Sequence, residues 1–132
     1  MSQNISFVDP AFKNAILTTT PYDLNGDNEI SYSEANAIAI LVLYAPIVSL
    51  SDLEHFNNLN HLHIETASLG FHDFVNCPSI ETLKLNNCGL DSIALYGLTD
   101  LDILELRVNN IESINLSNNR NLRYLRLSFN PL

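Results

Sequence analysis

The sequence predicts an α/β-type repeat solenoid, in which short 21-residue repeats form a parallel β-sheet and a helix-loop-helix unit covers the N-terminal end. The main observation is that apolar residues recur every 21 positions in the second half of the chain. A repeat this short leaves no room for a long helix between strands. The second observation is a polar segment, residues 23–34, that separates two short amphipathic stretches ahead of the repeats. The repeated columns are Leu59, Ile80, Leu101 and Leu122; Leu62, Leu83, Leu104 and Leu125; and Ile64, Leu85, Leu106 and Leu127.

We expect residues 1–40 to form the helical N-terminal cap. Asp9 can accept hydrogen bonds at the start of a helix whose first turn holds Pro10. A second helix is expected from residue 31 or 32 to about Ala39. Because the first coil of a solenoid exposes its core, the cap is expected to pack on that coil. The residues of the first helix that share its apolar face are Phe12, Ala15 and Ile16.

The segment between these helices, DLNGDNEISYSE, resembles the calcium-binding loop of an EF-hand. Ca²⁺ binds six to eight oxygen atoms, and oxygen-bearing side chains stand at positions 1, 3, 5, 9 and 12 of this loop. We expect one calcium ion, with a bidentate carboxylate at position 12 and a backbone carbonyl at position 7. Asn28 replaces the usual glycine at position 6, and asparagine also adopts the left-handed conformation. The predicted ligands are Asp23, Asn25, Asp27, Glu29, Ser31 and Glu34.

A simpler interpretation of the same segment is a polar turn followed by a helix capping box. Asn, Gly and Asp residues are typical of turns, and Ser31 and Glu34 have the spacing of a capping box. The apolar Ile30 at position 8 and the glutamate at position 12 favour the calcium loop over the plain turn.

Residues 41–132 are expected to form the solenoid, with about four to five coils. Each repeat follows L-x-x-L-x-L-x-x-(N/C)-x-L, as in Leu101–Ile111. A partial unit, residues 47–59, precedes the first full repeat, with a strand near residues 40–43. The second half of each repeat alternates apolar and polar residues, which predicts short extended stretches on the convex side. The ninth position, where a buried side chain can bond neighbouring turns, holds Ala67, Cys88, Asn109 and Asn130.

This repeat pattern resembles that of leucine-rich repeat proteins. The order FVDPAFKNAIL, then DLNGDNEISYSEA, then the repeats resembles secreted or surface leucine-rich repeat proteins of the Bacteroidetes. The resemblance implies an extracellular or cell-surface location and a non-enzymatic role in protein-protein interaction or adhesion. No signal peptide is visible, because polar residues follow Met1 directly.

The charge of the chain disfavours two classes of partner. The formal net charge is −9, and residues 1–83 hold ten acidic residues against Lys13 alone. Nucleic acids and anionic membranes are bound by clustered Lys and Arg, so we expect neither as the main partner. No membrane insertion is expected, because the apolar run at residues 35–43 is shorter than the roughly 20 residues of a span. Cys77 and Cys88 are expected to be small buried thiols rather than a disulfide.

The outward residues of the predicted strands form columns on the concave face. They mix aromatic, apolar and charged groups, which suits a protein or peptide ligand. The alternative is a set of solvated strand residues with complementary cross-strand charges, such as Lys84 with Glu105. A zinc site at His61, His63 and Glu65 is disfavoured, because no further ligand has a matching spacing. The predicted partner-binding residues are His61, His63, Lys84, Glu105, Arg107, Tyr124 and Arg126.

No catalytic motif is present, so we do not expect an enzyme: the chain lacks G-x-S-x-G and glycine-rich phosphate loops. The alternative to a binding module is a structural N-terminal fragment of a longer repeat protein with no ligand of its own. The repeat reaches only its eleventh position at Leu132, which leaves Leu122, Leu125 and Leu127 without cover and Phe129 close by. We therefore expect either a homodimer through the C-terminal coil or a natural chain that continues further.

Overall fold

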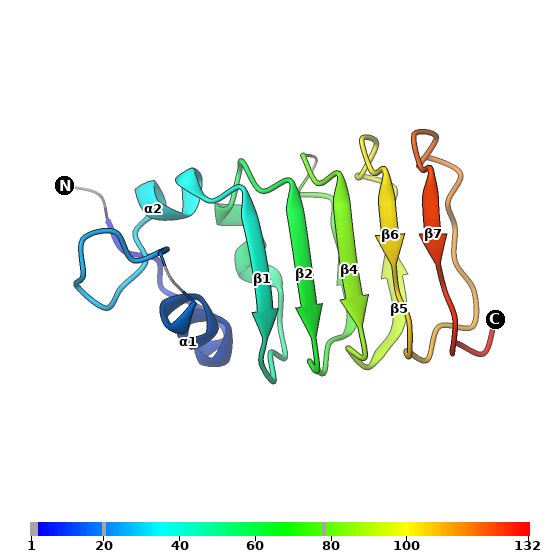
Figure 1. Cartoon of the computed structure of the whole chain (residues 1–132), viewed down its shortest axis with the longest axis horizontal. Helices are drawn as coiled ribbons and strands as arrows, with labels where there is room; N and C mark the ends of the chain where they lie inside the picture. The colour runs from blue at the N-terminus through cyan, green and yellow to red at the C-terminus, as the bar shows by residue number, and fades with distance from the viewer. Residues whose placement is uncertain (1–2, 20, 78) are drawn as a thin grey trace.

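The computed structural model describes residues 3–19, 21–77 and 79–132. The chain forms one row of stacked coils with two helices at its N-terminal end (Figure 1). A five-stranded parallel sheet with the order β1-β2-β4-β6-β7 runs along one side. This confirms the predicted solenoid. The strands are β1 (Ile40–Tyr44), β2 (His61–Glu65), β4 (Thr82–Asn86), β6 (Ile103–Glu105) and β7 (Tyr124–Arg126).

The 21-residue interval becomes the register of the sheet. Leu62 pairs with Leu83, Leu83 with Leu104, and Leu104 with Leu125. Alternate residues of a strand point to opposite sides of a sheet, so these leucines all point into the solenoid. The first three are fully buried. Stacking therefore converts a sequence period into a continuous apolar core.

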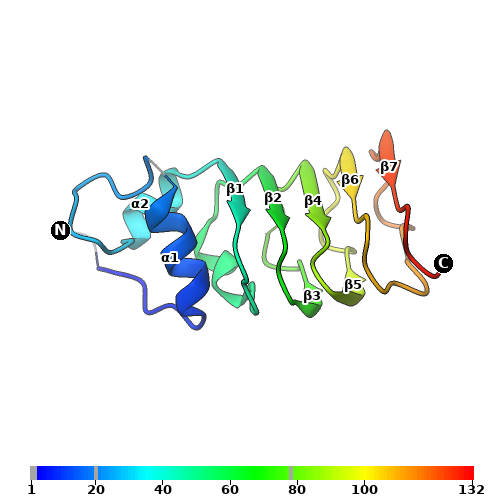
Figure 2. The same ribbon diagram turned by 60° about the horizontal axis from the view of Figure 1, so that its bottom comes forward.

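The opposite side of the solenoid is less regular (Figure 2). The first coil has a 3-10 helix, η1 (Ser51–His55), where the next two coils have the parallel strands β3 (Gly70–Asp73) and β5 (Leu90–Ala94). The extended stretch predicted around Ile93 is thus confirmed. Around Ile114, residues 112–116 are not assigned to a strand, so the extended stretch expected there stays a prediction. There the Ser117 amide donates to Asn115 Oδ1 (3.0 Å), a local turn that competes with a ladder.

Asn109 joins adjacent coils from a buried position. Its Oδ1 accepts the amides of Cys88 (3.0 Å) and Leu90 (3.1 Å) in the preceding coil. Its Nδ2 donates to the carbonyls of Leu85 (2.8 Å) and Leu106 (3.0 Å). One side chain therefore satisfies backbone groups that the turn would leave without partners.

The same position of the other repeats follows this pattern to different extents. Asn130 Nδ2 donates to the Leu106 carbonyl (2.7 Å), and its Oδ1 accepts the Ile111 amide (3.1 Å). Cys88 Sγ lies 3.2 Å from the Ile64 carbonyl, so a thiol takes the place of the amide donor. Both cysteines are free and buried, as expected, and burial raises the pKa of each thiol to about 11.

The cap consists of α1 (Pro10–Thr18) and α2 (Tyr32–Ala37). As predicted, Asp9 is the N-cap of α1, its Oδ1 accepting the Ala11 amide (2.9 Å), and Phe12, Ala15 and Ile16 are buried. The helix α2 ends two residues earlier than expected, because Ile38 is already extended ahead of β1.

Two buried carboxylates fasten the cap to the first coil. Asp9 Oδ2 accepts the Val48 amide (2.7 Å), and Asp52 Oδ2 accepts the Val8 amide (2.8 Å). Phe12 packs against Phe56 of the first coil, with ring centroids 5.9 Å apart. The cap and the solenoid therefore share one core. In the part of the chain that the structure describes, no helix is long and apolar enough to cross a bilayer.

Candidate functional site

The five-strand face is the outward surface of the five-stranded sheet. Its side chains are exposed or half-buried, and they alternate with the inward leucines. The register places the predicted columns side by side, so that His63, Lys84, Glu105 and Arg126 occupy one row across four strands. The residues of the face are Ile40, Val42, Tyr44, His61, His63, Glu65, Thr82, Lys84, Asn86, Ile103, Glu105, Tyr124 and Arg126.

Glu105 is the polar centre of the face. Lys84 Nζ lies 3.8 Å from Glu105 Oε1, which is one of the predicted cross-strand charge pairs. Asn86 Nδ2 donates to Glu105 Oε2 (3.3 Å). Ion pairs this close to solvent contribute only about 0–1 kcal/mol, so their main effect is to hold the side chains in one arrangement.

Arg107 lies at the edge of the face rather than within a strand. It was expected to continue the columns, but β6 ends at Glu105. Here the Asn86 side chain replaces a strand partner, its Oδ1 accepting the Arg107 amide (2.9 Å). The Arg107 Nε donates to Ser128 Oγ (3.2 Å), which orients the guanidinium along the ends of the strands.

The two predicted histidines lie together on β2. His63 Nε2 is 2.9 Å from Glu65 Oε1, and the His63 ring packs edge-on against Tyr44, with centroids 5.7 Å apart. Burial and the nearby Lys84 and His63 hold the pKa of His61 below its usual value. Among the described residues no three His, Cys, Asp or Glu side chains are close enough to hold a metal ion. His63 thus contacts both an acidic and an aromatic side chain of the face.

The last strand presents the most accessible groups of the face. Tyr124 is 43% exposed, and the Arg126 guanidinium carbon lies 6.0 Å from the centroid of its ring. Next to them Leu125 is 45% exposed, as expected for an uncovered coil, and Phe129 is 74% exposed at a repeat position where Val108 is exposed as well. Leu122 and Leu127 differ from that expectation, because they pack partly against the core.

The segment predicted to bind calcium, residues 23–34, contains a tight polar turn. Gly26 and Asn28 both have positive φ, 74° and 62°, so asparagine does adopt the left-handed conformation at position 6. Asp23 accepts the amides of both, Gly26 through Oδ1 (2.8 Å) and Asn28 through Oδ2 (3.0 Å). Asp27 Oδ1 accepts the Glu29 amide (2.9 Å), so side-chain oxygens line the inside of a tight turn.

Glu34, the predicted bidentate ligand, is occupied by hydrogen bonds within the chain. Its Oε2 accepts the Ser31 amide (2.8 Å) and hydroxyl (2.9 Å), and Ser31 Oγ accepts the Glu34 amide, which completes a capping box. Its Oε1 accepts the amides of Leu24 (2.9 Å) and Asn25 (3.3 Å). Burial opposes the charged form, but these hydrogen bonds hold the pKa of Glu34 below its usual value.

Comparison with solved structures supports the repeat assignment. A functional domain of InlJ from Listeria monocytogenes, described as including a cysteine ladder, matches with a TM-score of 0.83 and 18% identity over 98% of this chain. The internalins C2 and InlF from the same species match with TM-scores of 0.64 and 0.58 at 22% and 20% identity. The chain has a leucine-rich repeat fold.

The leucine-rich repeat match includes most of the cap, because the InlJ and internalin C2 alignments each cover 98% of the chain. The chain spans 29% of the InlJ domain, 44% of InlF and 72% of internalin C2. A scan of protein-family models and a search of curated protein sequences each found no match. The resemblance to Bacteroidetes surface proteins stays a prediction.

The sequence predicted a strand near residues 40–43 but not its register, so its outward residues were not included in the predicted face. Ile40, Val42 and Tyr44 of β1 pair with His61, His63 and Glu65, and Tyr44 is 64% exposed. Their signal was present, since each stands 21 residues before its partner on β2. The repeat was harder to see there because the first coil replaces the strand of later coils with η1.

Proposed function

We propose that this chain is a non-enzymatic interaction or adhesion module that binds a protein or peptide through the five-strand face. The observation that carries the proposal is the composition of this surface. It places Tyr44, Tyr124 and Arg126 on a rigid parallel sheet beside charges of both signs. Tyr and Arg are enriched among residues that dominate binding energy, and a preorganised sheet limits the entropy lost on association.

The charge distribution supports a protein partner over a nucleic acid. Net charge −9 repels phosphate backbones at long range. The basic groups of the face, Lys84 and Arg126, stand in the second half of the chain, one of them already close to Glu105. A partner with its own mixture of charged and apolar side chains matches this surface, whereas a uniform polyanion does not.

One calcium ion in the Asp23–Glu34 loop is a further part of the proposal. The donor set fits Ca²⁺ in chemistry, since all of its ligating atoms are oxygens. Asp23, Asn25, Asp27 and Glu34 would hold the ion through side chains and Glu29 through its carbonyl, with Ser31 at position 9. For Glu34 this requires exchanging hydrogen bonds from Ser31 or Leu24 for the ion. When bound, the ion would tie α1 and α2 together.

We further propose an extracellular or cell-surface location. The proposal follows from the resemblance of the sequence to secreted or surface leucine-rich repeat proteins of the Bacteroidetes. A protease added to intact cells that produce the full-length protein tests it. Digestion of the repeat region without lysis is the expected result, and protection of that region until lysis would contradict it.

The function is tested by capture and quantitative binding. The immobilised chain is offered a mixture of extracellular proteins, with calcium or with a chelator, and captured proteins are purified and titrated by calorimetry. The double variant Tyr124→Ala with Arg126→Ala is expected to weaken binding at least about tenfold. The matched control is Tyr96→Ala with Arg120→Ala, which removes the same exposed side chains outside the face.

The two double variants separate the alternatives. Loss of binding only in the control would move the site to the back of the solenoid. Equal affinity in all three proteins would contradict binding through the five-strand face. Absence of any specific captured protein would favour the structural-fragment interpretation, in which the chain has no ligand of its own.

A further inference from the structure

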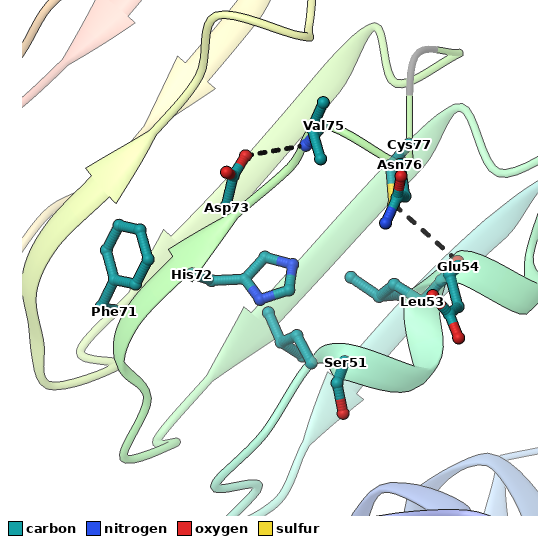
Figure 3. A pocket seen from close by; sticks show the side chains of 10 residues that line it. Ser51, Leu53, Glu54, Phe71, His72, Asp73, Val75, Asn76 and Cys77 are labelled. Atoms are coloured by element: carbon teal, nitrogen blue, oxygen red, sulfur yellow. Dashed lines mark hydrogen bonds between the residues drawn. The ribbon is translucent and has the colours of Figure 1, made fainter.

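A second surface, the back hollow, lies between η1 and β3, away from the five-strand face (Figure 3). Its volume is about 300 Å³. It exists because a 3-10 helix in the first coil stands beside a strand in the second, and a 3-10 helix cannot continue the hydrogen-bond ladder of β3. Its walls are formed by the apolar residues Leu53, Phe71 and Val75 and the polar residues Glu54, His72 and Asp73.

The backbone of β3 turns hydrogen-bond acceptors toward this hollow. The Phe74 amide, directly after β3, donates to the Ala94 carbonyl of β5 (3.2 Å), and the pairing is in regular register from Phe71 to Asp73. In a parallel pair alternate residues bond to the same neighbour, so the carbonyls of Phe71 and Asp73 point away from β5, toward η1.

The side chains add further acceptors. The His72 ring projects into the hollow (Figure 3) and packs edge-on against Phe74, with centroids 4.5 Å apart. Burial lowers the pKa of His72, with nearby Asp73 opposing, so the imidazole is neutral near pH 7 and keeps one acceptor nitrogen. Asp73 accepts the Val75 amide (3.0 Å) and the Tyr96 hydroxyl (3.0 Å). The Glu54 side chain is about half exposed at the rim, with Oε1 3.8 Å from His55 Nε2.

The occupant must therefore be a cation rich in donors with an apolar stem. Residues 1–83 hold ten acidic residues and Lys13 alone, and Lys13 is paired with Glu29. A guanidinium group has five N–H donors and no acceptor, and its three methylene groups can lie along apolar side chains such as Phe71 and Val75. An ammonium group offers only three donors from one point.

We propose that the back hollow binds an arginine side chain of a partner protein, between Glu54 and the acceptors of β3. The guanidinium lies against the carboxylate of Glu54 and the carbonyls of β3, and its stem lies on Phe71. This site is independent of the five-strand face, so a partner can contact both sides of the solenoid.

The test uses the whole chain and a small probe, the tripeptide acetyl-Gly-Arg-Gly-amide, followed by NMR chemical shifts. We expect saturable shifts at the His72 ring and the Phe71 amide. The peptide with citrulline in place of arginine keeps the shape but lacks the charge, and we expect it to give no saturable shift. Glu54→Gln is expected to weaken the arginine peptide about tenfold.

The matched control is Glu112→Gln, which removes the same charge from an exposed residue of a later coil, and it is expected to leave the affinity unchanged. Melting temperatures of both variants establish that each is folded. Equal shifts with the citrulline peptide, an absence of saturation, or unchanged affinity in Glu54→Gln would each overturn the proposal. Tyr124→Ala with Arg126→Ala should bind the arginine peptide normally, which separates this site from the five-strand face.

Discussion

Asn109 connects three stretches of backbone through one buried amide group. Its hydrogen bonds reach the strand end at Leu85, the turn at Cys88 and Leu90, and its own coil at Leu106. Such groups have no access to water, so losing their partner has a larger cost than the net value of the bonds themselves. The hydrogen bonds of Asn109 therefore fix the conformation of the turns between coils, as the backbone hydrogen bonds fix the pairing of the strands.

We predict that Asn109→Ala lowers the free energy of unfolding by about 3 kcal/mol, because it leaves buried amides and carbonyls without partners. Urea denaturation followed by circular dichroism measures this loss. The matched control is Asn110→Ala at the exposed neighbouring position, which should change stability by less than about 0.5 kcal/mol. A similar loss of unfolding free energy in both variants would show that the hydrogen bonds of Asn109 contribute little to stability.

At the scale of elements, the carboxylate of Glu34 has one role in the structure of the cap and a second in the calcium proposal. Glu34 already completes the capping box of α2, and the calcium proposal asks it to serve the loop as well. Any variant at Glu34 therefore perturbs the helix whether or not calcium binds. Asp27 is the better test, because it is exposed and belongs only to the loop.

We predict that calcium raises the melting temperature of the chain and that Asp27→Asn removes most of this increase. A ligand at a hundred times its Kd adds about 2.7 kcal/mol of stability. In a chelator the variant should melt near the original temperature, since the asparagine oxygen can still accept the Glu29 amide. Differential scanning calorimetry measures both values.

Asp91→Asn on β5 is the control for this measurement and should keep the full calcium effect. An undiminished effect in Asp27→Asn would place the ion elsewhere. If calcium leaves the original chain unchanged, the segment is the polar turn with a capping box.

The elements that the sequence predicted well are those in which a repeat sets the geometry. The interval of 21 predicted the pairing of Leu62, Leu83 and Leu104, because stacked coils align equivalent residues. Spacing could not predict where each strand ends. Asn86 accepts the Arg107 amide with its side chain, and that contact between coils shortens β6 without leaving a periodic signal.

The candidate site likewise has one part that the repeat predicts and one part that depends on contacts between coils. The face could be predicted because outward residues follow the period, apart from β1, where the first coil departs from the pattern. The back hollow could not, because it depends on a mismatch between a 3-10 helix and a strand. Neither Glu54 nor His72 belongs to a recognisable motif, and only the packing of η1 beside β3 brings them together.

For the whole molecule, the last coil is where an inward leucine of the repeat becomes exposed. Leu125 is 45% exposed, whereas the equivalent residues of earlier coils, such as Leu104, are fully buried, and Phe129 beside it is 74% exposed. The outer edge of β7 also presents unpaired strand groups. We propose that two chains associate through this coil as a symmetric dimer.

Leu125→Glu is predicted to convert this dimer to a monomer, because it places a charge in the apolar contact. Leu127→Glu is a poorer choice, since Leu127 packs partly against the core and its loss would destabilise the fold. Sedimentation velocity at micromolar concentration measures the change, with Val48→Glu on the first coil as an exposed control. A monomeric original chain would contradict the proposal.

Stacking in a single row has an electrical consequence. Because each coil advances the chain by about 4.8 Å, the order of residues along the sequence becomes distance along one axis (Figure 1). The cap holds five acidic residues and Lys13, whereas the last coil holds Arg120, Arg123 and Arg126. The molecule therefore has a permanent electric dipole along the row of coils, negative at the cap and positive at β7. This dipole orients an approaching charged protein before contact. The association rate is therefore expected to fall as salt is added.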